Sequence, residues 1–385
     1  MITSLASVKA DKLYGPHLST TTYRELPPSP VNSRGEPFHT EFTCFSYDDD
    51  HVYRHDESGL RWYYHYPLDI GVDLSQGFET FDKHDDSQDE HLVSLLKSIV
   101  EYEKMNGKVE AAIVTWRGMM TKILTAPFES RDGFEMNATS FQGTIFIEEN
   151  HEYKIETRRK QERERRPGRF TSDEMSYWGY KFETLCTLPR PWGEVSRTEI
   201  EARTTERVSN KAQYCSIVTT NMGPTKVCMG GEVDALWGSK PKDPNIPPEW
   251  VELKTSVTPR SDRDIDLFHA KLLKFWAQSY LIGASRVIVG FRTRDGMLES
   301  VKELWTAELP GVRPRNWDAD VCVDFAVDFL QFLRKTITDE GVWRIRRQAG
   351  RPFIEVFRVT GKGHGDILTE EFVAWRTSGI KGGEG

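Results

Sequence analysis

Two short segments carry charged residues at spacings that could bind a metal ion and a phosphate group. Glu232 and Asp234 lie in MGGEVDAL, and Glu252 and Lys254 lie in WVELKTS. Each segment reads as a short strand, because charged residues alternate with Val or Leu. That period would put each pair of charges on one strand face. If the strands are neighbours, three carboxylates and one ammonium converge, and the carboxylates would repel strongly unless a divalent cation held them.

The order Asp, spacer, Glu-x-Lys is also the constellation of metal-dependent PD-(D/E)xK nucleases. Phosphodiester hydrolysis needs a hydroxide aimed in line at phosphorus and stabilisation of charge on the phosphate oxygens. Two Mg²⁺ or Mn²⁺ ions about 4 Å apart can supply both, and such hard cations prefer the oxygen ligands that Asp and Glu offer. Each short pattern is common by itself, so the alternative is two half-exposed strands with acidic solvent faces.

The overall composition is that of a soluble globular protein, and 385 residues suffice for one large domain or two. A net charge of -8 argues against broad coating of a nucleic-acid duplex, but it permits a narrow basic channel that leads to an acidic, metal-filled site. Five scattered cysteines without a C-x-x-C pair fit a reducing compartment and do not support a zinc site or a disulfide framework. No stretch resembles a membrane span or a signal peptide, which predicts a cytoplasmic or nuclear protein with no membrane partner.

The elements that must position these residues follow from periodicity. Residues 1–40, rich in Pro, Ser and Thr, are predicted to form an extended or poorly ordered arm, and residues 41–385 a single domain. Strands are expected within 41–75, 111–129, 141–150 and 285–296. Helices are expected at 88–105, 268–283 and 320–337, and a further helix, capped by Ser172 or Asp173, would carry Glu183 near its far end.

Two segments do not fit this frame. Residues 158–169, RRKQERERRPGR, hold seven basic and two acidic residues. They read as a solvated loop or helix end, with an RNA-facing loop or a nuclear localisation signal as functional alternatives. Residues 193–208 are polar and predict a mobile excursion, and Pro-rich 239–250 reads as the loop that joins the two acidic strands.

Six ordered motifs resemble the Rai/DXO family of RNA decapping enzymes, most closely its fungal nuclear Rai-like members. The resemblance covers nearly all of the chain after the first forty residues. The motifs are TWRG with Arg117, GYKFE at 179–183, GEVDA at 231–235, VELKTS at 251–256, KLLKFWAQSYL at 271–281 and GFR at 290–292.

The resemblance implies a single α/β domain of two twisted mixed β-sheets with flanking helices and a PD-(D/E)xK nuclease-like core. It implies two divalent cations, Mg²⁺ or Mn²⁺, and a pocket that admits the single-stranded 5′ end of RNA. The implied metal ligands are Glu183, Glu232, Asp234, Glu252 and the main-chain carbonyl of Leu253. The implied substrate contacts are Lys254 and Gln278 at the scissile phosphate and Arg117 at the RNA backbone.

Residue type alone leaves several of these roles open. Arg117 lies in an apolar stretch and needs a counter-charge, which could be a phosphate or an internal carboxylate. Gln278 could be a buried amide satisfied by backbone. Glu183 could be an ordinary surface acid, and Lys254 a surface lysine if its strand face meets solvent.

The function implied is a metal-dependent hydrolase in RNA 5′-end quality control. It would remove pyrophosphate from 5′-triphosphate RNA and release incompletely methylated or NAD-type caps, and some members also degrade RNA 5′→3′. The resemblance also implies nuclear localisation and a nuclear 5′–3′ exoribonuclease partner. Two alternatives stay open: a non-catalytic activator of that exoribonuclease, and a PD-(D/E)xK DNA nuclease. The preferred cap, the preferred metal and the oligomeric state do not follow from the sequence.

Overall fold

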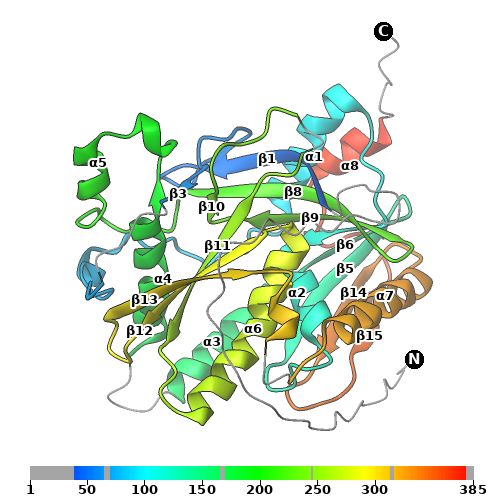
Figure 1. The fold of residues 1–385 in the computed structure, drawn as a ribbon. Helices are drawn as coiled ribbons and strands as arrows, with labels where there is room; N and C mark the ends of the chain where they lie inside the picture. The colour runs from blue at the N-terminus through cyan, green and yellow to red at the C-terminus, as the bar shows by residue number, and fades with distance from the viewer. Residues whose placement is uncertain (1–38, 65–69, 165–169, 244–245, 313–315, 379–385) are drawn as a thin grey trace.

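The computed structural model describes residues 39–64, 70–164, 170–243, 246–312 and 316–378, which form two mixed β-sheets with helices packed on them (Figure 1). The first strand, β1 (His39–Tyr47), begins where the predicted arm was expected to end. Residues 1–38 lie outside the described part, so the arm stays a prediction. Within the described ranges, none of the helices combines the length and apolar character that a bilayer crossing needs.

The larger sheet has nine strands in the order β15-β14-β5-β6-β4-β9-β8-β1-β2. Its central strand β4 is parallel to both of its neighbours, β6 and β9. The carboxyl ends of these three strands therefore lie at one edge of the sheet. The remaining strands are β2 (Tyr53–Arg54), β4 (Ile113–Trp116), β5 (Phe134–Phe141), β6 (Thr144–Glu149), β8 (Gln213–Met222), β9 (Thr225–Glu232), β14 (Val342–Arg347) and β15 (Glu355–Thr360).

The smaller sheet has six strands in the order β13-β12-β11-β10-β3-β7. Its longest members, β11 (Trp250–Val257), β12 (Arg286–Arg292) and β13 (Leu298–Trp305), carry the parallel pair β11–β12. The others are β3 (Trp62–Tyr63), β7 (Thr187–Leu188) and β10 (Ala235–Leu236). Because β9 ends at Glu232 and β10 begins at Ala235, the chain crosses from one sheet to the other at Val233 and Asp234.

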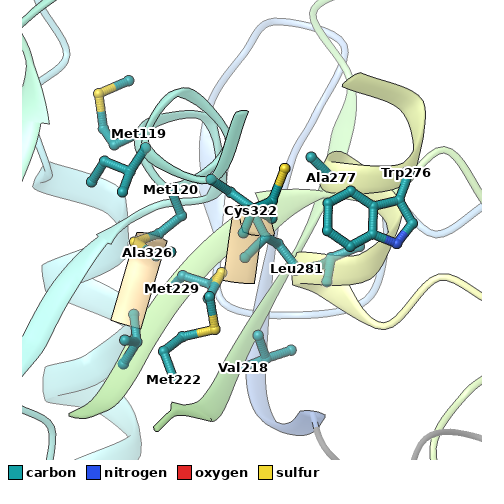
Figure 2. Close-up of a cluster of buried hydrophobic side chains, with 14 of the residues drawn as sticks. Met119, Met120, Val218, Met222, Met229, Trp276, Ala277, Leu281, Cys322 and Ala326 are labelled. Carbon is teal, nitrogen blue, oxygen red and sulfur yellow. The ribbon is translucent and has the colours of Figure 1, made fainter. Parts of the chain in front are cut away.

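Helices α2 (Arg117–Thr125) and α6 (Asp262–Ile282) lie between the two sheets. α2 packs on β4, β6 and β9, α6 packs on β11 and β12, and the two helices pack on each other. With α7 (Ala319–Thr336) they enclose the main apolar core (Figure 2), which includes Met119, Met120, Met229, Leu281, Cys322 and Ala326. The other helices are α1 (Val93–Asn106), α3 (His151–Arg163), α4 (Ser172–Cys186), α5 (Arg197–Ala202) and α8 (Glu370–Thr377), with 3₁₀ turns at Phe78–Thr80, Trp192–Glu194 and Leu309–Gly311.

Two local predictions were wrong. Residues 111–129 were expected to be strands, but only β4 is extended, and α2 begins at Arg117. Met119, Met120, Ile123 and Leu124 recur at helical spacing and are all buried, so the period of the buried face outweighed the β-propensity of the segment. The cap of α4 is Thr171, in a capping box with Glu174, one residue before the predicted positions.

The basic segment, read as a solvated loop or helix end, includes the end of a helix without buried residues, and the polar stretch also contains regular structure. Helix α3 covers much of the basic segment and ends at Arg163, and residues 165–169 lie outside the described part. The polar stretch 193–208 contains the short helix α5, whose Ile200 is buried against Tyr64 and Leu188. Its predicted mobility stays untested.

Candidate active site

The junction between the two sheets gathers residues from four separate elements. Arg117 follows the last residue of β4, Glu232 ends β9, Asp234 lies in the crossover, and Glu252 lies in β11. Trp116 pairs with Gly230 in the parallel ladder, which places Arg117 beside Gly231. A Cβ atom on Gly231 would lie 3.0 Å from the Arg117 Cβ, a tight contact that glycine avoids at this close approach.

The sheet arrangement corrects one premise of the sequence argument. The two acidic strands are not neighbours in one sheet, because β9 belongs to the larger sheet and β11 to the smaller one. β11 pairs instead with β10, with Ala235 opposite Val251. The acids still converge, because the crossover at Asp234 directs the chain from β9 to the edge of β11.

Glu252 is the centre of the charge network. Its carboxylate is 0% exposed and accepts hydrogen bonds from Arg117 Nη1 at 3.0 and 3.1 Å and from Lys254 Nζ at 2.7 Å. Burial alone would raise the pKa of Glu252, but Arg117 and Lys254 together lower it. The counter-charge of Arg117, left open by the sequence, is therefore an internal carboxylate.

Asp234 is fixed against the backbone of β11. Its Oδ2 accepts a hydrogen bond from the Leu253 amide at 2.6 Å and lies 3.9 Å from Lys254 Nζ. Since the N–H and C=O of a strand residue point to the same side, the Leu253 carbonyl also faces the acidic group. The predicted use of this carbonyl as a metal ligand is consistent with that direction.

Three of the carboxyl groups are held in environments that disfavour their charge. Burial and the neighbouring Asp234 raise the pKa of Glu232 to about 7. Burial and Glu252 raise the pKa of Asp234 to about 6. Burial and both of these acids raise the pKa of Glu183 well above its ordinary value. Such repulsion is what a bound cation would relieve.

Glu183 reaches the site from α4, which packs on β11. The preceding residue, Phe182, is fully buried and lies over Gly290 of β12. A Cβ atom on Gly290 would lie 2.6 Å from the Phe182 ring, so this glycine sets how closely α4 approaches the sheet. A glycine within an apolar strand indicates a close approach of another element, so Gly290 in the motif GFR is the signal in the sequence for this contact.

The last predicted contact, Gln278, lies on α6 and is half-buried between buried Ala277 and Ser279. Within the described residues, no hydrogen bond joins its amide to the acids or to Lys254. The structure therefore brings together Glu183, Glu232, Asp234, Glu252, Lys254, Arg117 and Leu253, and it leaves the role of Gln278 as a prediction.

The donor set suits hard divalent cations. Four carboxylates and one carbonyl offer only oxygen ligands, which favours Mg²⁺, Mn²⁺ or Ca²⁺ over softer metals. No three of the four acids bring one oxygen each within 4.8 Å of one another. Glu252 is held instead by Arg117 and Lys254, and the carboxyl groups repel one another when charged. Within the described ranges, groups that do meet this spacing lie elsewhere, at His51, His84 and Glu90 and at Asp89, His91 and Glu148.

Comparison with known proteins agrees with this geometry. The family model described as RAI1-like PD-(D/E)XK nuclease matches residues 39–373. The decapping nuclease RAI1 of Neurospora crassa is 55% identical over 343 residues, which cover 87% of this chain and 82% of that protein.

Solved structures show the same fold. The structure of Candida albicans Rai1 in complex with pU5-Mn²⁺ has a TM-score of 0.82 and 30% identity, and covers 89% of this chain and 95% of that one. The structure of Scheffersomyces stipitis Rai1 with (3′-NADP)⁺ and calcium has a TM-score of 0.81 and 27% identity, and covers 88% and 96%. The predicted fold class, two mixed sheets with flanking helices around a nuclease-like core, is confirmed. The chain belongs to the RAI1-like PD-(D/E)XK nuclease family.

Proposed function

We propose that this chain is a metal-dependent phosphodiester hydrolase that acts on the 5′ end of RNA in 5′-end quality control. The observation that carries the proposal is the junction of the two sheets, where Glu183, Glu232 and Asp234 face the Arg117–Glu252–Lys254 network. The chain's relatives named decapping nucleases, at up to 55% identity among those compared, support the same reaction class.

Each residue has a defined task in this proposal. Glu183, Glu232, Asp234, Glu252 and the Leu253 carbonyl would hold two Mg²⁺ or Mn²⁺ ions, which supply an activated water and neutralise charge on the phosphate. Burial alone would lower the pKa of Lys254, but Glu252 and Asp234 raise it, so this ammonium stays charged and can contact a phosphate oxygen. Arg117 holds Glu252 in place and would contact the RNA backbone. Gln278 would donate to the scissile phosphate.

The substrate class follows from the relatives. Candida albicans Rai1 was solved with pU5 and Mn²⁺, and Scheffersomyces stipitis Rai1 with (3′-NADP)⁺ and calcium. We extend these ligands to this chain as 5′-phosphorylated single-stranded RNA and NAD-type ends. The expected products are pyrophosphate from 5′-triphosphate RNA and the intact cap from incompletely methylated or NAD-capped RNA. A 5′→3′ exoribonuclease activity on the remaining monophosphate RNA would use the same site.

We further propose nuclear localisation and a nuclear 5′–3′ exoribonuclease as protein partner. Both rest on the similarity to fungal relatives named RAI1. Copurification with that exoribonuclease would support the partnership. Stimulation of the exoribonuclease by the Glu232→Ala/Asp234→Ala variant would show that the binding role does not need the candidate active site.

The decisive experiment is a product assay on one RNA with five different 5′ ends: triphosphate, unmethylated cap, methylated cap, NAD and monophosphate. Each RNA is incubated with Mg²⁺ or Mn²⁺ and either the wild type or the Glu232→Ala/Asp234→Ala variant. Release of pyrophosphate or intact cap by the wild type alone supports the proposal. A DNA oligonucleotide of the same sequence should stay uncut. If no end yields a metal-dependent product, the non-catalytic activator becomes the better account.

A further inference from the structure

Two histidines and a glutamate meet outside the candidate active site. His51 lies between β1 and β2, while His84 and Glu90 lie in the segment that leads to α1. The Glu90 Oε1 atom is 3.2 Å from His51 Nε2 and 3.0 Å from His84 Nε2. One ligand atom from each residue therefore lies within 4.8 Å of the other two.

The hydrogen bonds of His51 fix which ring nitrogen faces Glu90. His51 Nδ1 lies 2.8 Å from the carbonyl oxygen of Lys211, which can only accept, so Nδ1 carries the proton. In the neutral ring, Nε2 then presents a lone pair to a carboxylate oxygen that is also an acceptor. Two acceptors at this distance require a positive charge between them, either a proton or a metal ion.

The surroundings hold the His51 ring and the backbone of His84 in place. Tyr47 stacks on the His51 ring at 3.9 Å between centroids, and the Tyr47 hydroxyl is hydrogen-bonded to Ser94 at 2.6 Å. The main-chain amide of His84 donates to Asn210 Oδ1 at 2.7 Å. A carbonyl partner on the second imidazole nitrogen and a fixed ring plane are the usual supporting shell of a histidine metal ligand.

The local charge also favours a cation. Residues 82–91 contain five carboxylates and one lysine. Asp82 and Asp86 are paired with Lys211 and Arg158, and the remaining Asp85, Asp89 and Glu90 raise the local concentration of dications. The side chains of His51 and His84 are 12% and 23% exposed, whereas that of Glu90 is 51% exposed. Solvent can therefore reach one side of the group and complete a coordination shell.

We propose that His51, His84 and Glu90 bind one transition-metal dication of the Zn²⁺ class, at a site separate from the acidic cluster. Imidazole and carboxylate ligands of tetrahedral zinc lie about 3.3 Å from one another, close to the separations observed here. The His51 and His84 rings are stacked at 3.7 Å between centroids, so binding swings His84 out of the stack until its lone pair meets the ion. Nitrogen ligands favour Zn²⁺ here, whereas the all-oxygen cluster favours Mg²⁺ or Mn²⁺.

The position of the group gives the ion a structural task. Tyr47 pairs with Gln213 and Phe45 with Cys215 across β1 and β8, and Cys215 pairs in turn with Glu232 across β8 and β9. His51 therefore follows β1 at the sheet edge where β9 ends in the candidate active site. An ion held by these three residues would tie the segment 82–91 to the β1–β2 turn beside that site.

The test measures zinc binding by the untagged full chain, after removal of metal by a chelator and with excess Mg²⁺ present to saturate the acidic cluster. Calorimetric titration with Zn²⁺ gives stoichiometry and affinity, and Co²⁺ substitution reports tetrahedral nitrogen and oxygen ligands through its visible absorption. The wild type and Glu232→Ala/Asp234→Ala should each bind one equivalent. His84→Ala and Glu90→Gln should each weaken binding at least tenfold, the size of effect seen for disturbed metal sites.

The controls keep the assignment falsifiable. His55→Ala removes an exposed histidine that is hydrogen-bonded to Thr43 and does not belong to either three-residue group, and it should bind zinc like the wild type. Glu90→Gln keeps the shape of a half-exposed side chain, so it tests the site even if His84→Ala folds poorly. If zinc binding is unchanged in both His84→Ala and Glu90→Gln, the proposal is overturned. Loss of zinc binding in Glu232→Ala/Asp234→Ala overturns it as well. Loss in His91→Ala but not in His84→Ala would place the ion at Asp89, His91 and Glu148 instead.

Discussion

At the scale of single residues, Glu252 has two roles. It is the counter-charge of buried Arg117 and of Lys254, and it is also a predicted metal ligand. A bound cation would draw the carboxylate partly away from the two basic groups, leaving their donors available for phosphate oxygens. The same network that stabilises the metal-free protein therefore prepares the site for its substrate.

This dual role predicts opposite stability effects for two isosteric substitutions. Glu252→Gln leaves Arg117 and Lys254 without their shared counter-charge and should cost about 3 kcal/mol of unfolding free energy. Glu232→Gln removes one repelling charge and should stabilise the metal-free protein at pH 8 by about 1 kcal/mol. Both should lose hydrolysis. Urea unfolding in EDTA measures the difference, and equal destabilisation by the two variants would contradict the assigned roles.

The raised pKa values predict a pH dependence of the metal-free protein. Glu232 and Asp234 titrate at about 7 and about 6 in the folded chain, above the ordinary values of unfolded Glu and Asp. The folded state therefore holds their protons more tightly. This stabilising contribution is complete below the ordinary pKa values of about 4, declines as pH rises above them, and is fully lost once pH has passed the folded values of about 6 and about 7.

Thermal unfolding in EDTA between pH 5 and pH 8 tests this expectation. The melting temperature of the wild type should fall across the interval, and that of Glu232→Gln/Asp234→Asn should fall less. Because cation binding displaces those protons, Mg²⁺ should bind more tightly at pH 8 than at pH 5.5. A wild-type melting temperature that falls no more than that of the variant across this interval would refute the shifted pKa values.

How much of the site the sequence predicted also differs from residue to residue. Glu232, Asp234, Glu252 and Lys254 were predicted from their spacing, because alternation within a strand fixes their face, whereas Glu183 was predicted only from the family resemblance. The ion pair between Arg117 and Glu252 was not predicted, because the two residues are 135 positions apart and no local pattern indicates such a contact. The His51, His84 and Glu90 group was missed for the same reason, since its members come from two separate loops.

At the scale of elements, the site depends on how closely α4 approaches the smaller sheet. Gly290 has no room for a methyl group beneath Phe182, which precedes Glu183. Gly290→Ala should push α4 outward, cost about 1–3 kcal/mol of stability as an overpacked core does, and reduce hydrolysis at least tenfold by displacing Glu183.

Gly179→Ala is the matched control for that change. It lies on α4, the helix that Gly290→Ala should displace. A methyl group there meets nothing within 4 Å, and alanine is favoured over glycine in a helix by about 1 kcal/mol. Stability should rise and activity stay unchanged. If Gly290→Ala keeps full activity, the helix position does not control Glu183.

Element prediction failed where local and tertiary signals disagreed. The segment 111–129 contains β-branched residues, yet the chain turns from strand to helix at Arg117 because the buried positions after it follow a helical period. The crossover at Asp234 was equally hidden, since Glu232 and Asp234 share a strand-like pattern but the strand ends between them. The long periodic helix α7 was predicted to within one residue at each end, and α6 was predicted as a helix but begins six residues earlier, at Asp262.

At the scale of the whole molecule, the candidate metal ligands come from both sheets. Glu232 belongs to the larger sheet, Glu252 and Leu253 belong to the smaller one, and Glu183 comes from the helix that packs on the smaller sheet. A cation bound by all of them is a link between the two halves of the fold. It would also bind the native state alone, because the unfolded chain does not gather these groups.

This link predicts a global effect of Mg²⁺ that the Glu232→Ala/Asp234→Ala variant lacks. At one hundred times its dissociation constant, an ion that binds only the folded chain stabilises it by about 2.7 kcal/mol. Urea unfolding should show that gain in the wild type, and amide hydrogen exchange should slow in β9 and β11 together, since opening either sheet breaks the link. Protection confined to one sheet would mean that the ion is held by that sheet alone, and an equal gain in the variant would place it outside the junction. The geometry of the crossover requires that Mg²⁺ slows exchange in both sheets of the wild type, and that this protection disappears in the Glu232→Ala/Asp234→Ala variant.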